Sequence, residues 1–272
     1  MDAAETAGGG VVYIPNGNYY ISGLNIGAGV VLRGQSTSNT ILYYKGTGSN
    51  FINSKDANSR GGIAQLQGVA NMSLRLSDSA KIPGTFIVLG HLFTSDLWGN
   101  KLLRKANRIF ISGVDISHTR IAVPDWVGMS AQWIGKERVL IQNNHFVTTG
   151  GTFTNMTTYA IFRNNYAEFD YYAFSSMATY GFYENNYVWV HRESNHPEQH
   201  GINARDSAYV ANNTIIDPGV ADNSMNEGES IMTESPPMTG AGYNSGTVTG
   251  GTANSITVVP WKPLPACAGC SG

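Results

Sequence analysis

The segment Trp189–Asp206, with the sequence WVHRESNHPEQHGINARD, carries the densest group of chemically active side chains in the protein. It holds three of the six histidines and two arginines: His191, His196, His200, Arg192 and Arg205. Histidine moves protons near neutral pH, and arginine can bind a carboxylate through two parallel hydrogen bonds. Together they suit β-elimination from a uronic acid polymer. In that reaction a cation neutralises the carboxylate, a base removes the C5 proton and an acid protonates the leaving oxygen.

We therefore expect His200 to act as base or acid, with His196 in the same loop, and Arg205 or Arg192 to bind the substrate carboxylate. Two other interpretations stay open. The segment is also consistent with a solvated polar loop containing one or two buried histidines. A zinc site from His191, His196 and His200 is the third, although spacings of five and four residues within a loop are not a typical ligand pattern.

A second group is acidic. No lysine or arginine lies between Arg205 and Lys262, whereas six carboxylates do: Asp206, Asp217, Asp222, Glu227, Glu229 and Glu234. Glu229 and Glu234 stand at the two ends of an expected strand, and two carboxylates across a cleft could hydrolyse a glycoside. Clustered carboxylates could also bind calcium, and an acidic loop in solvent needs neither role. No cofactor is required by these chemistries, and calcium is possible.

The elements that must position these residues repeat along the chain. Five units share one pattern, a short apolar strand, a tight polar turn and a second short strand: ISGVDI (111–116), IQNNHF (141–146), FRNNYA (162–167), YENNYV (183–188) and VANNTI (210–215). The first asparagine falls at 143, 164, 185 and 212. A period near 20 residues indicates a solenoid, in which each unit buries its apolar face only by stacking on the next.

Asparagine suits one fixed point of every unit because it tolerates the left-handed backbone region and hydrogen-bonds to its neighbours. Stacked asparagine side chains can also bond along the solenoid and so satisfy buried amides. Gly113 stands at the matching point of the first unit. Ordinary hairpin turns are the alternative, which four pairs in register disfavour. On these units the chain resembles the pectate-lyase-like right-handed parallel β-helix proteins, which have an internal asparagine ladder.

The run AGGGVVYIPNGNYYISG, followed by VVLRGQSTSNTIL, resembles the first coils of the same class, which includes polysaccharide lyases and tailspike depolymerases. The resemblance implies an all-β, right-handed parallel β-helix with loop insertions on one face, and a secreted protein. It also implies a capping helix, of which residues 1–10, with Asp2–Thr6 helical, would be a remnant. We expect one domain over residues 1–272, with a β-hairpin and tail in 236–272. The catalytic signatures of polygalacturonases and classical pectate lyases are absent, so the resemblance assigns no catalytic residue.

Counting along the units places three strands on one face of the solenoid: Gly151–Asn155, Tyr172–Ser176 and Gly201–Arg205. Alternation predicts that Phe153, Phe174 and Ile202 point inward. The same alternation predicts an outward polar floor with Thr154, Ser175 and Asn203. A sugar chain could lie on this floor, although a plain solvated sheet face has the same pattern. Exposed aromatic side chains would stack on sugars: Trp126, Tyr172 and Trp189.

Composition excludes some classes of function. The 272 residues have a net charge of −2, and only 13% of them are charged, so nothing points to nucleic acid or a membrane surface. Cys267 and Cys270 form a CAGC motif that reads as a local disulfide or an incidental pair. The end of the chain lacks an obvious cap for the solenoid. We therefore expect a fragment, or a solenoid capped by a missing C-terminal region, a partner or a second copy.

Three functions follow. The first is a secreted polysaccharide lyase acting on an acidic, uronate-containing glycan, favoured by the histidine and arginine segment. The second is a glycoside hydrolase that uses Glu229 and Glu234, and the third is a non-catalytic glycan-binding or adhesion solenoid. A C5-epimerase would share the proton abstraction of the lyase.

Overall fold

The computed structural model describes residues 1–27, 29–48, 50–55, 66–77, 83, 85–89, 108–117, 128–132, 138–155, 159–176, 180–190, 198–205, 208–216, 227–234, 246–252 and 255–260. The chain separates into two compact units, Met1–Met232 and Thr233–Gly272. Whether residues 1–272 form one domain, as the sequence predicts, depends on how these two units are arranged, so the single domain stays a prediction. Cys267 and Cys270 lie outside the described residues.

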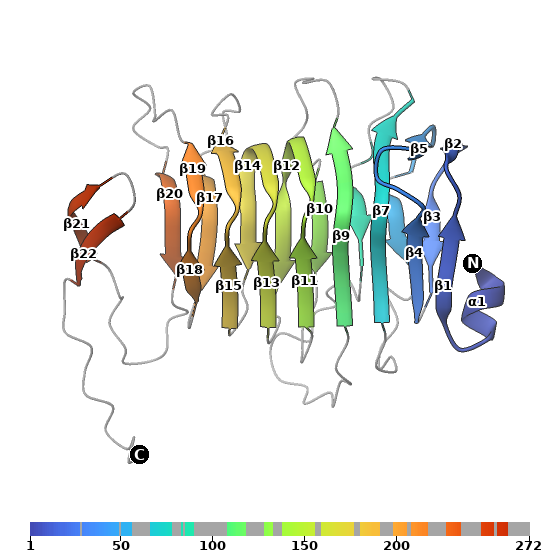
Figure 1. Ribbon diagram of the computed structural model, residues 1–272, viewed down its shortest axis with the longest axis horizontal. Helices are drawn as coiled ribbons and strands as arrows, with labels where there is room; N and C mark the ends of the chain where they lie inside the picture. The colour runs from blue at the N-terminus through green and yellow to red at the C-terminus, as the bar shows by residue number, and fades with distance from the viewer. Residues whose placement is uncertain are drawn as a thin grey trace, which may run out of the picture. The chain divides into compact units, whose positions relative to one another are not determined.

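The first unit is a parallel β-helix, which confirms the predicted fold class. Its strands form three parallel sheets, because each coil of the chain adds one strand to each sheet in turn. Among the described residues, eight successive coils stack in this way, and their strands lie side by side in Figure 1. Four long strands, β7, β9, β12 and β14, run from one sheet into the next, so the three sheets share strands.

The first sheet consists of β1 (Gly10–Ile14), β4 (Val30–Gly34), the first halves of β7 (Leu66–Leu76) and β9 (Arg108–Ser117), β11 (Arg138–Gln142), β13 (Tyr159–Arg163), β15 (Tyr180–Glu184) and β18 (Tyr209–Ala211). The second sheet consists of β2 (Gly17–Ile21), β5 (Thr40–Tyr44), the second halves of β7 and β9, the first halves of β12 (His145–Asn155) and β14 (Tyr166–Ser176), β16 (Tyr187–Val190) and β19 (Thr214–Ile216). The third sheet consists of β3 (Leu24–Ile26), β6 (Asn50–Ser54), β8 (Thr85–Val88), β10 (Gly128–Gln132), the second halves of β12 and β14, β17 (Glu198–Arg205) and β20 (Glu227–Glu234).

From the third coil to the eighth, the corner between the first and second sheets is made by one residue in the left-handed region. This residue is the first asparagine of each pair, with φ of 53° to 54°, and Gly113 takes the same place with φ of 64°. A left-handed residue reverses the pleat abruptly, and asparagine and glycine adopt this conformation at little cost. Asn71 makes the same turn in an earlier coil, although it is not part of an Asn-Asn pair.

The second asparagine of each pair forms the ladder, which runs through Asn144, Asn165, Asn186 and Asn213. Asn165 shows the pattern. Its Nδ2 donates to Asn186 Oδ1 at 2.9 Å and to the Ile141 carbonyl at 3.0 Å. Its Oδ1 accepts from Nδ2 and from the backbone N–H of Asn144, at 2.9 and 3.1 Å. Every donor and acceptor of a buried amide is thereby used, which is the condition for burying it without a free-energy penalty.

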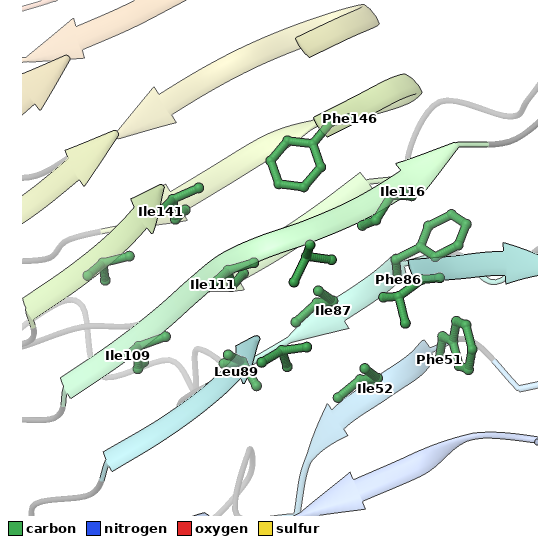
Figure 2. Packing of buried hydrophobic residues seen from close by; sticks show 14 of the residues in the cluster. Phe51, Ile52, Phe86, Ile87, Leu89, Ile109, Ile111, Ile116, Ile141 and Phe146 are labelled. Atoms are coloured by element: carbon green, nitrogen blue, oxygen red, sulfur yellow. The ribbon is translucent and has the colours of Figure 1, made fainter. Parts of the chain in front are cut away.

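The space inside the coils is filled with apolar side chains from all three sheets. Figure 2 shows isoleucine and phenylalanine side chains of successive coils packed on one another, including Phe51, Ile87, Ile111 and Phe146. Further along, the Phe162 ring stacks on the Tyr183 ring at a centroid distance of 5.1 Å. Inward side chains of equivalent positions thus contact each other from coil to coil, as the solenoid interpretation requires.

The helix α1 (Asp2–Thr6) is present where the sequence predicts it. Lys55 Nζ bonds to Asp2 Oδ1 at 3.2 Å and to Glu5 Oε2 at 2.8 Å, which ties the helix to the second coil. Met1 and Ala4 pack against the core. Among the described residues, no helix is long and apolar enough to cross a membrane.

One alignment differs from the prediction. The register of the third sheet pairs Phe174 with Ile202 on one side and with Thr152 on the other, whereas Phe153 pairs with Ser175. The prediction that Phe153 shares the inward column of Phe174 and Ile202 is therefore wrong. The cause is a register irregularity between Gly151 and Thr152, since one extra residue in a strand moves every later residue to the opposite face.

The described residues of the second unit form an antiparallel hairpin of β21 (Gly246–Thr252) and β22 (Ser255–Pro260). This agrees with the hairpin predicted late in the chain.

Candidate functional site

The predicted floor lies on the third sheet, and the backbone register shows which of its residues are neighbours. His200 pairs with Tyr172, and Asn203 pairs with Ser175. Thr154 pairs with Ser176, so it stands one position out of the row that Ser175 and Asn203 form. Phe174 and Ile202, between these pairs, are fully buried. Strands β14 and β17 therefore bring together four of the predicted site residues.

The other predicted residues are more scattered. Arg205 ends β17, and Glu229 lies near the start of β20, the next strand of the third sheet. Glu234 belongs to the second compact unit. Trp189 lies on the second sheet with 39% of its surface exposed. Four predicted residues lie outside the described part of the chain, namely Trp126, His191, Arg192 and His196.

The described residues contain no site for the zinc or the calcium that the sequence analysis considered. Within the described residues, no three His, Cys, Asp or Glu side chains gather as metal ligands would. Two of the three histidines of the zinc alternative are outside the described ranges. Several carboxylates of the calcium alternative, such as Asp217 and Asp222, are also outside them. Both metals therefore remain expectations from the sequence.

A second group, which the sequence interpretation missed, lies on the outer face of the second sheet. The register aligns Asp115, His145, Tyr166 and Tyr187 on four successive coils. Residues aligned on adjacent parallel strands point to the same face, so their side chains meet. The His145 ring stacks on Tyr166 at 4.9 Å, and Tyr166 stacks on Tyr187 at 5.2 Å. We call these four residues the histidine row.

Asp115 is held from two sides. Arg75 Nη2 donates to Asp115 Oδ2, and Arg75 Nη1 donates to the carbonyls of Leu74 and Asp115 at 3.0 Å. The other carboxylate oxygen, Oδ1, is 3.0 Å from His145 Nδ1. An arginine thus fixes the carboxylate, and the carboxylate fixes the imidazole, which is the arrangement that orients a histidine for proton transfer.

The charge state of Asp115 decides which nitrogen of His145 carries the proton. Burial raises the pKa of Asp115, but hydrogen bonds from His145 and Arg75 and the charge of Arg75 outweigh burial, so the pKa lies below its ordinary value. The ionised carboxylate accepts a hydrogen bond from Nδ1–H, so in the neutral form of the ring Nε2 is the acceptor. Nε2 has no protein partner among the described residues, and the His145 side chain is 52% exposed.

Tyr166 is an un-ionised phenol at neutral pH. Its hydroxyl donates to Glu168 Oε1, two residues further along β14. Burial and the bond to Glu168 raise the pKa of Tyr166 to about 12. A phenol with this pKa stays protonated at neutral pH, with its hydrogen directed at Glu168.

The histidine row and the predicted floor are separate places on the same strands. In β14, Tyr166 belongs to the row, and Tyr172, six residues later, is the neighbour of His200. At about 3.3 Å per residue this separation is roughly 20 Å along the strand. Strand β9 ends at Ser117 and β16 ends at Val190, whereas β12 and β14 continue from the second sheet into the third.

A signal for the histidine row exists in the sequence. His145, Tyr166, Tyr187 and Thr214 each follow an Asn-Asn pair directly, as in NNHF, NNYA, NNYV and NNTI. Because the pairs mark equivalent points of the solenoid, the residue after each pair must occupy one outward column. A comparison of this column from unit to unit would have predicted that His145, Tyr166 and Tyr187 are neighbours on successive coils.

The lowered pKa of Asp115 predicts a pH effect on stability. A carboxylate whose pKa is lower in the folded protein stabilises the fold above its ordinary value of 3.8, and this contribution disappears as the pH falls through the folded pKa. We expect wild type to unfold at a higher temperature than Asp115→Asn at neutral pH, with the difference shrinking below about pH 4. Thermal unfolding followed by circular dichroism over this range measures it. A difference that is constant with pH would contradict the ion pair.

Comparisons with known proteins support the fold. No protein-family model and no curated protein matches the chain. The A-module of the mannuronan C-5 epimerase AlgE6 of Azotobacter vinelandii superimposes with a TM-score of 0.51 at 17% identity, over 79% of this chain and 61% of that one. The A-module of the epimerase AlgE4 of the same organism gives a TM-score of 0.46 at 18% identity, over 79% and 63%.

The described architecture and the similarity to the AlgE6 module define this chain as a parallel β-helix protein. The chain spans about three fifths of the length of each epimerase module. At these identities the similarity extends to the fold, and the chemistry must be argued from the side chains.

Proposed function

We propose that this protein is a secreted polysaccharide lyase that cleaves an acidic, uronate-containing glycan by β-elimination. The observation that carries the proposal is the contact of Asp115 with His145 Nδ1, which leaves Nε2 of a half-exposed imidazole as the nitrogen that can act as a base. The β-helix fold supports it by providing a long, regular surface on which a polymeric substrate can bind.

In this proposal His145 Nε2 removes the proton at C5 of a uronate. The electron pair of the C–H bond forms the C4=C5 double bond, and the C4–O bond to the neighbouring sugar breaks. Tyr166, whose ring contacts the imidazole and whose phenol is protonated, gives a proton to the leaving oxygen. Arg75 acts through Asp115 as a positioning residue, since its guanidinium is already bound to that carboxylate and to two backbone carbonyls.

The substrate carboxylate needs a cation of its own, because removal of the C5 proton creates negative charge next to it. Arg192, which the sequence analysis predicts as a carboxylate-binding residue, is one candidate for this cation and lies outside the described residues. Arg205, at the far end of β17, is the other arginine of the original prediction. On the third sheet, His200 remains the alternative base.

The name of the AlgE6 module states that it acts on mannuronan, and C5-epimerisation begins with the same proton removal. If a proton returned to C5 from the opposite face before the C4–O bond broke, this chain would be an epimerase. Polymannuronate therefore belongs among the test substrates, together with polygalacturonate and glucuronate-containing glycans.

The test is to incubate the purified full chain with this panel and record three signals. A rise in ultraviolet absorbance from the C4=C5 double bond is the expected result. New reducing ends without that absorbance would overturn elimination in favour of hydrolysis by carboxylates such as Glu229 and Glu234. A changed uronate composition by NMR without chain cleavage would overturn it in favour of epimerisation. Binding with none of the three signals would show a non-catalytic solenoid.

A further inference from the structure

We propose that the outer face of the first sheet is a separate binding site for an anionic polysaccharide. The site is a groove over strands β9, β11, β13 and β15, which we call the arginine groove. Its defining residues are three arginines and three aromatic residues: Arg108, Arg138, Arg163, Phe110, Tyr159 and Phe182. The histidine row lies on the second sheet, so the two sites occupy different faces of the solenoid.

The size of the groove suits an extended ligand. Its volume is about 710 Å³, within the range of about 300–1,000 Å³ that is usual for ligand sites. The floor is apolar, formed by the partly exposed side chains of Phe110, Leu140 and Ile161, which the register aligns on three successive strands. A floor of this kind offers contact area but no hydrogen bonds, so orientation must come from the arginines.

The charges of the groove are unbalanced. The register places Arg108 directly beside Arg138 on neighbouring strands, and both side chains are exposed. Neither makes an ion pair with a described residue. Over β11, β13 and β15 the only carboxylate is Glu184, which the register pairs with Arg163, so one carboxylate stands against three arginines. Two adjacent like charges cost free energy in the free protein, and an anionic ligand would remove that cost.

The positive groove contrasts with the chain as a whole, which has a net charge of −2. Such a local excess attracts polyanions selectively and makes binding dependent on salt. Arg163 is oriented within the groove by a hydrogen bond from its Nε to Gln142 Oε1 at 2.9 Å, so its terminal nitrogens can bind a ligand.

Aromatic rings in the groove favour a sugar polymer among polyanions. The guanidinium of Arg138 lies 5.5 Å from the centre of the Tyr159 ring, which is 39% exposed. Phe182 is 37% exposed and contacts Tyr209, which is 50% exposed. Exposed rings beside cations provide stacking surface for the apolar faces of pyranoses and charge for their carboxylates.

A glycine shapes one end of the floor. Gly68 pairs with Phe110 across β7 and β9, and a Cβ atom at Gly68 would lie 2.5 Å from the Phe110 ring. The missing side chain lets the ring lie over the strand and close the end of the floor. The coils repeat at about 4.8 Å, close to the length of one pyranose unit, so a glycan along the solenoid axis could present one carboxylate per coil.

The test is a titration of the full chain with polymannuronate and polygalacturonate oligosaccharides by calorimetry, at low and high salt. All proteins carry His145→Ala, so that turnover does not consume the probe and binding is measured apart from catalysis. We expect Arg138→Ala to weaken binding roughly threefold to fivefold and Arg108→Ala/Arg138→Ala roughly tenfold or more. The matched control Lys45→Ala, which removes a charge outside the groove, should change it less than twofold.

Several outcomes would overturn the proposal. Equal affinity of the double variant and the Lys45→Ala control would do so, provided that both proteins unfold at the parental temperature. Binding of neutral dextran as tight as that of the uronates would remove the role of charge. Tighter binding of DNA than of the uronates would assign the groove to nucleic acid. A dimer in sedimentation that Phe182→Ala dissociates would assign it to a second copy of the chain.

Discussion

Replacement of His145 by alanine is expected to lower the rate of elimination by a factor of about 10² to 10⁴, the usual contribution of a positioned general base. The variant removes Nε2 of His145. Among the described histidines, this is the one whose other ring nitrogen contacts a carboxylate, that of Asp115. The measurement is the initial rate of double-bond absorbance on the best substrate of the panel. Folding should be maintained, because the side chain is half exposed and its losses are one hydrogen bond to Asp115 and one ring contact.

Two further variants give the prediction its controls. Thr214→Ala alters the same outward column two coils beyond Tyr166 and should leave the rate within about twofold, as expected for a surface change. His200→Ala tests the base predicted on the third sheet. Full activity in His145→Ala together with loss in His200→Ala would move the reaction to the floor of β14 and β17 and refute the role of the histidine row.

Asp115→Asn separates positioning from chemistry. The substitution keeps the size of the side chain but removes the charge that holds the proton on His145 Nδ1. We expect kcat to fall while KM changes little, because the residue contacts the base and not the substrate. A purely structural role would instead change stability without moving the pH profile of kcat.

The second large effect concerns stability. Replacement of Asn165 by alanine should lower the free energy of unfolding by about 3–6 kcal/mol, because each buried polar group left unpaired costs about 1–3 kcal/mol. The Ile141 carbonyl and the N–H of Asn144 lose the bond that Asn165 makes, and Nδ2 of Asn144 loses one bond while keeping the other to the Ile111 carbonyl. Since whole domains are stable by only about 5–15 kcal/mol, the variant should be near its unfolding threshold at room temperature.

The matched control is the neighbouring residue of the same turn. Asn164 is exposed, has φ of 53° and gives one side-chain bond of 3.3 Å to Asn143. Glycine accepts this conformation, so Asn164→Gly should change stability by less than about 1 kcal/mol. Denaturant unfolding of the two variants makes the comparison. Similar losses in both would show that the turn, and not the ladder, carries the stability.

Much of the fold could be predicted because the Asn-Asn pairs report a fixed point in each coil. The two asparagines of a pair nevertheless have different structural roles, and the sequence alone does not show which residue has which role. Asn143 makes the left-handed turn and Asn144 makes the ladder. The sequence analysis missed Asn71 because methionine follows it and no Asn-Asn pair marks the turn. Asn71 makes the left-handed turn, but its coil has no ladder asparagine. The prediction for Phe153 was wrong for another reason. The register irregularity beside Gly150 and Gly151 cannot be recognised from the alternation of apolar and polar residues in the sequence.

The site was harder to predict than the fold. A loop rich in histidine and arginine attracts attention in a sequence, whereas His145 is a single histidine in a regular strand. Its significance comes from Asp115, thirty residues earlier, and from Arg75, in the coil before that. Such a group exists only once the coils are stacked in register, so the local sequence around His145 could not reveal it.

The spacing of the ladder has a consequence for how such a protein can change in length. Asn144, Asn165 and Asn186 are 21 residues apart, and the first sheet keeps this offset through β11, β13 and β15. Removal or duplication of one 21-residue unit would place equivalent asparagine turns next to each other. Each ladder asparagine would then still have a partner in the next coil. The solenoid is therefore modular. Whole coils can be gained or lost in evolution or by design, whereas an extra residue within a strand shifts the register of the residues that follow, as between β12 and β14.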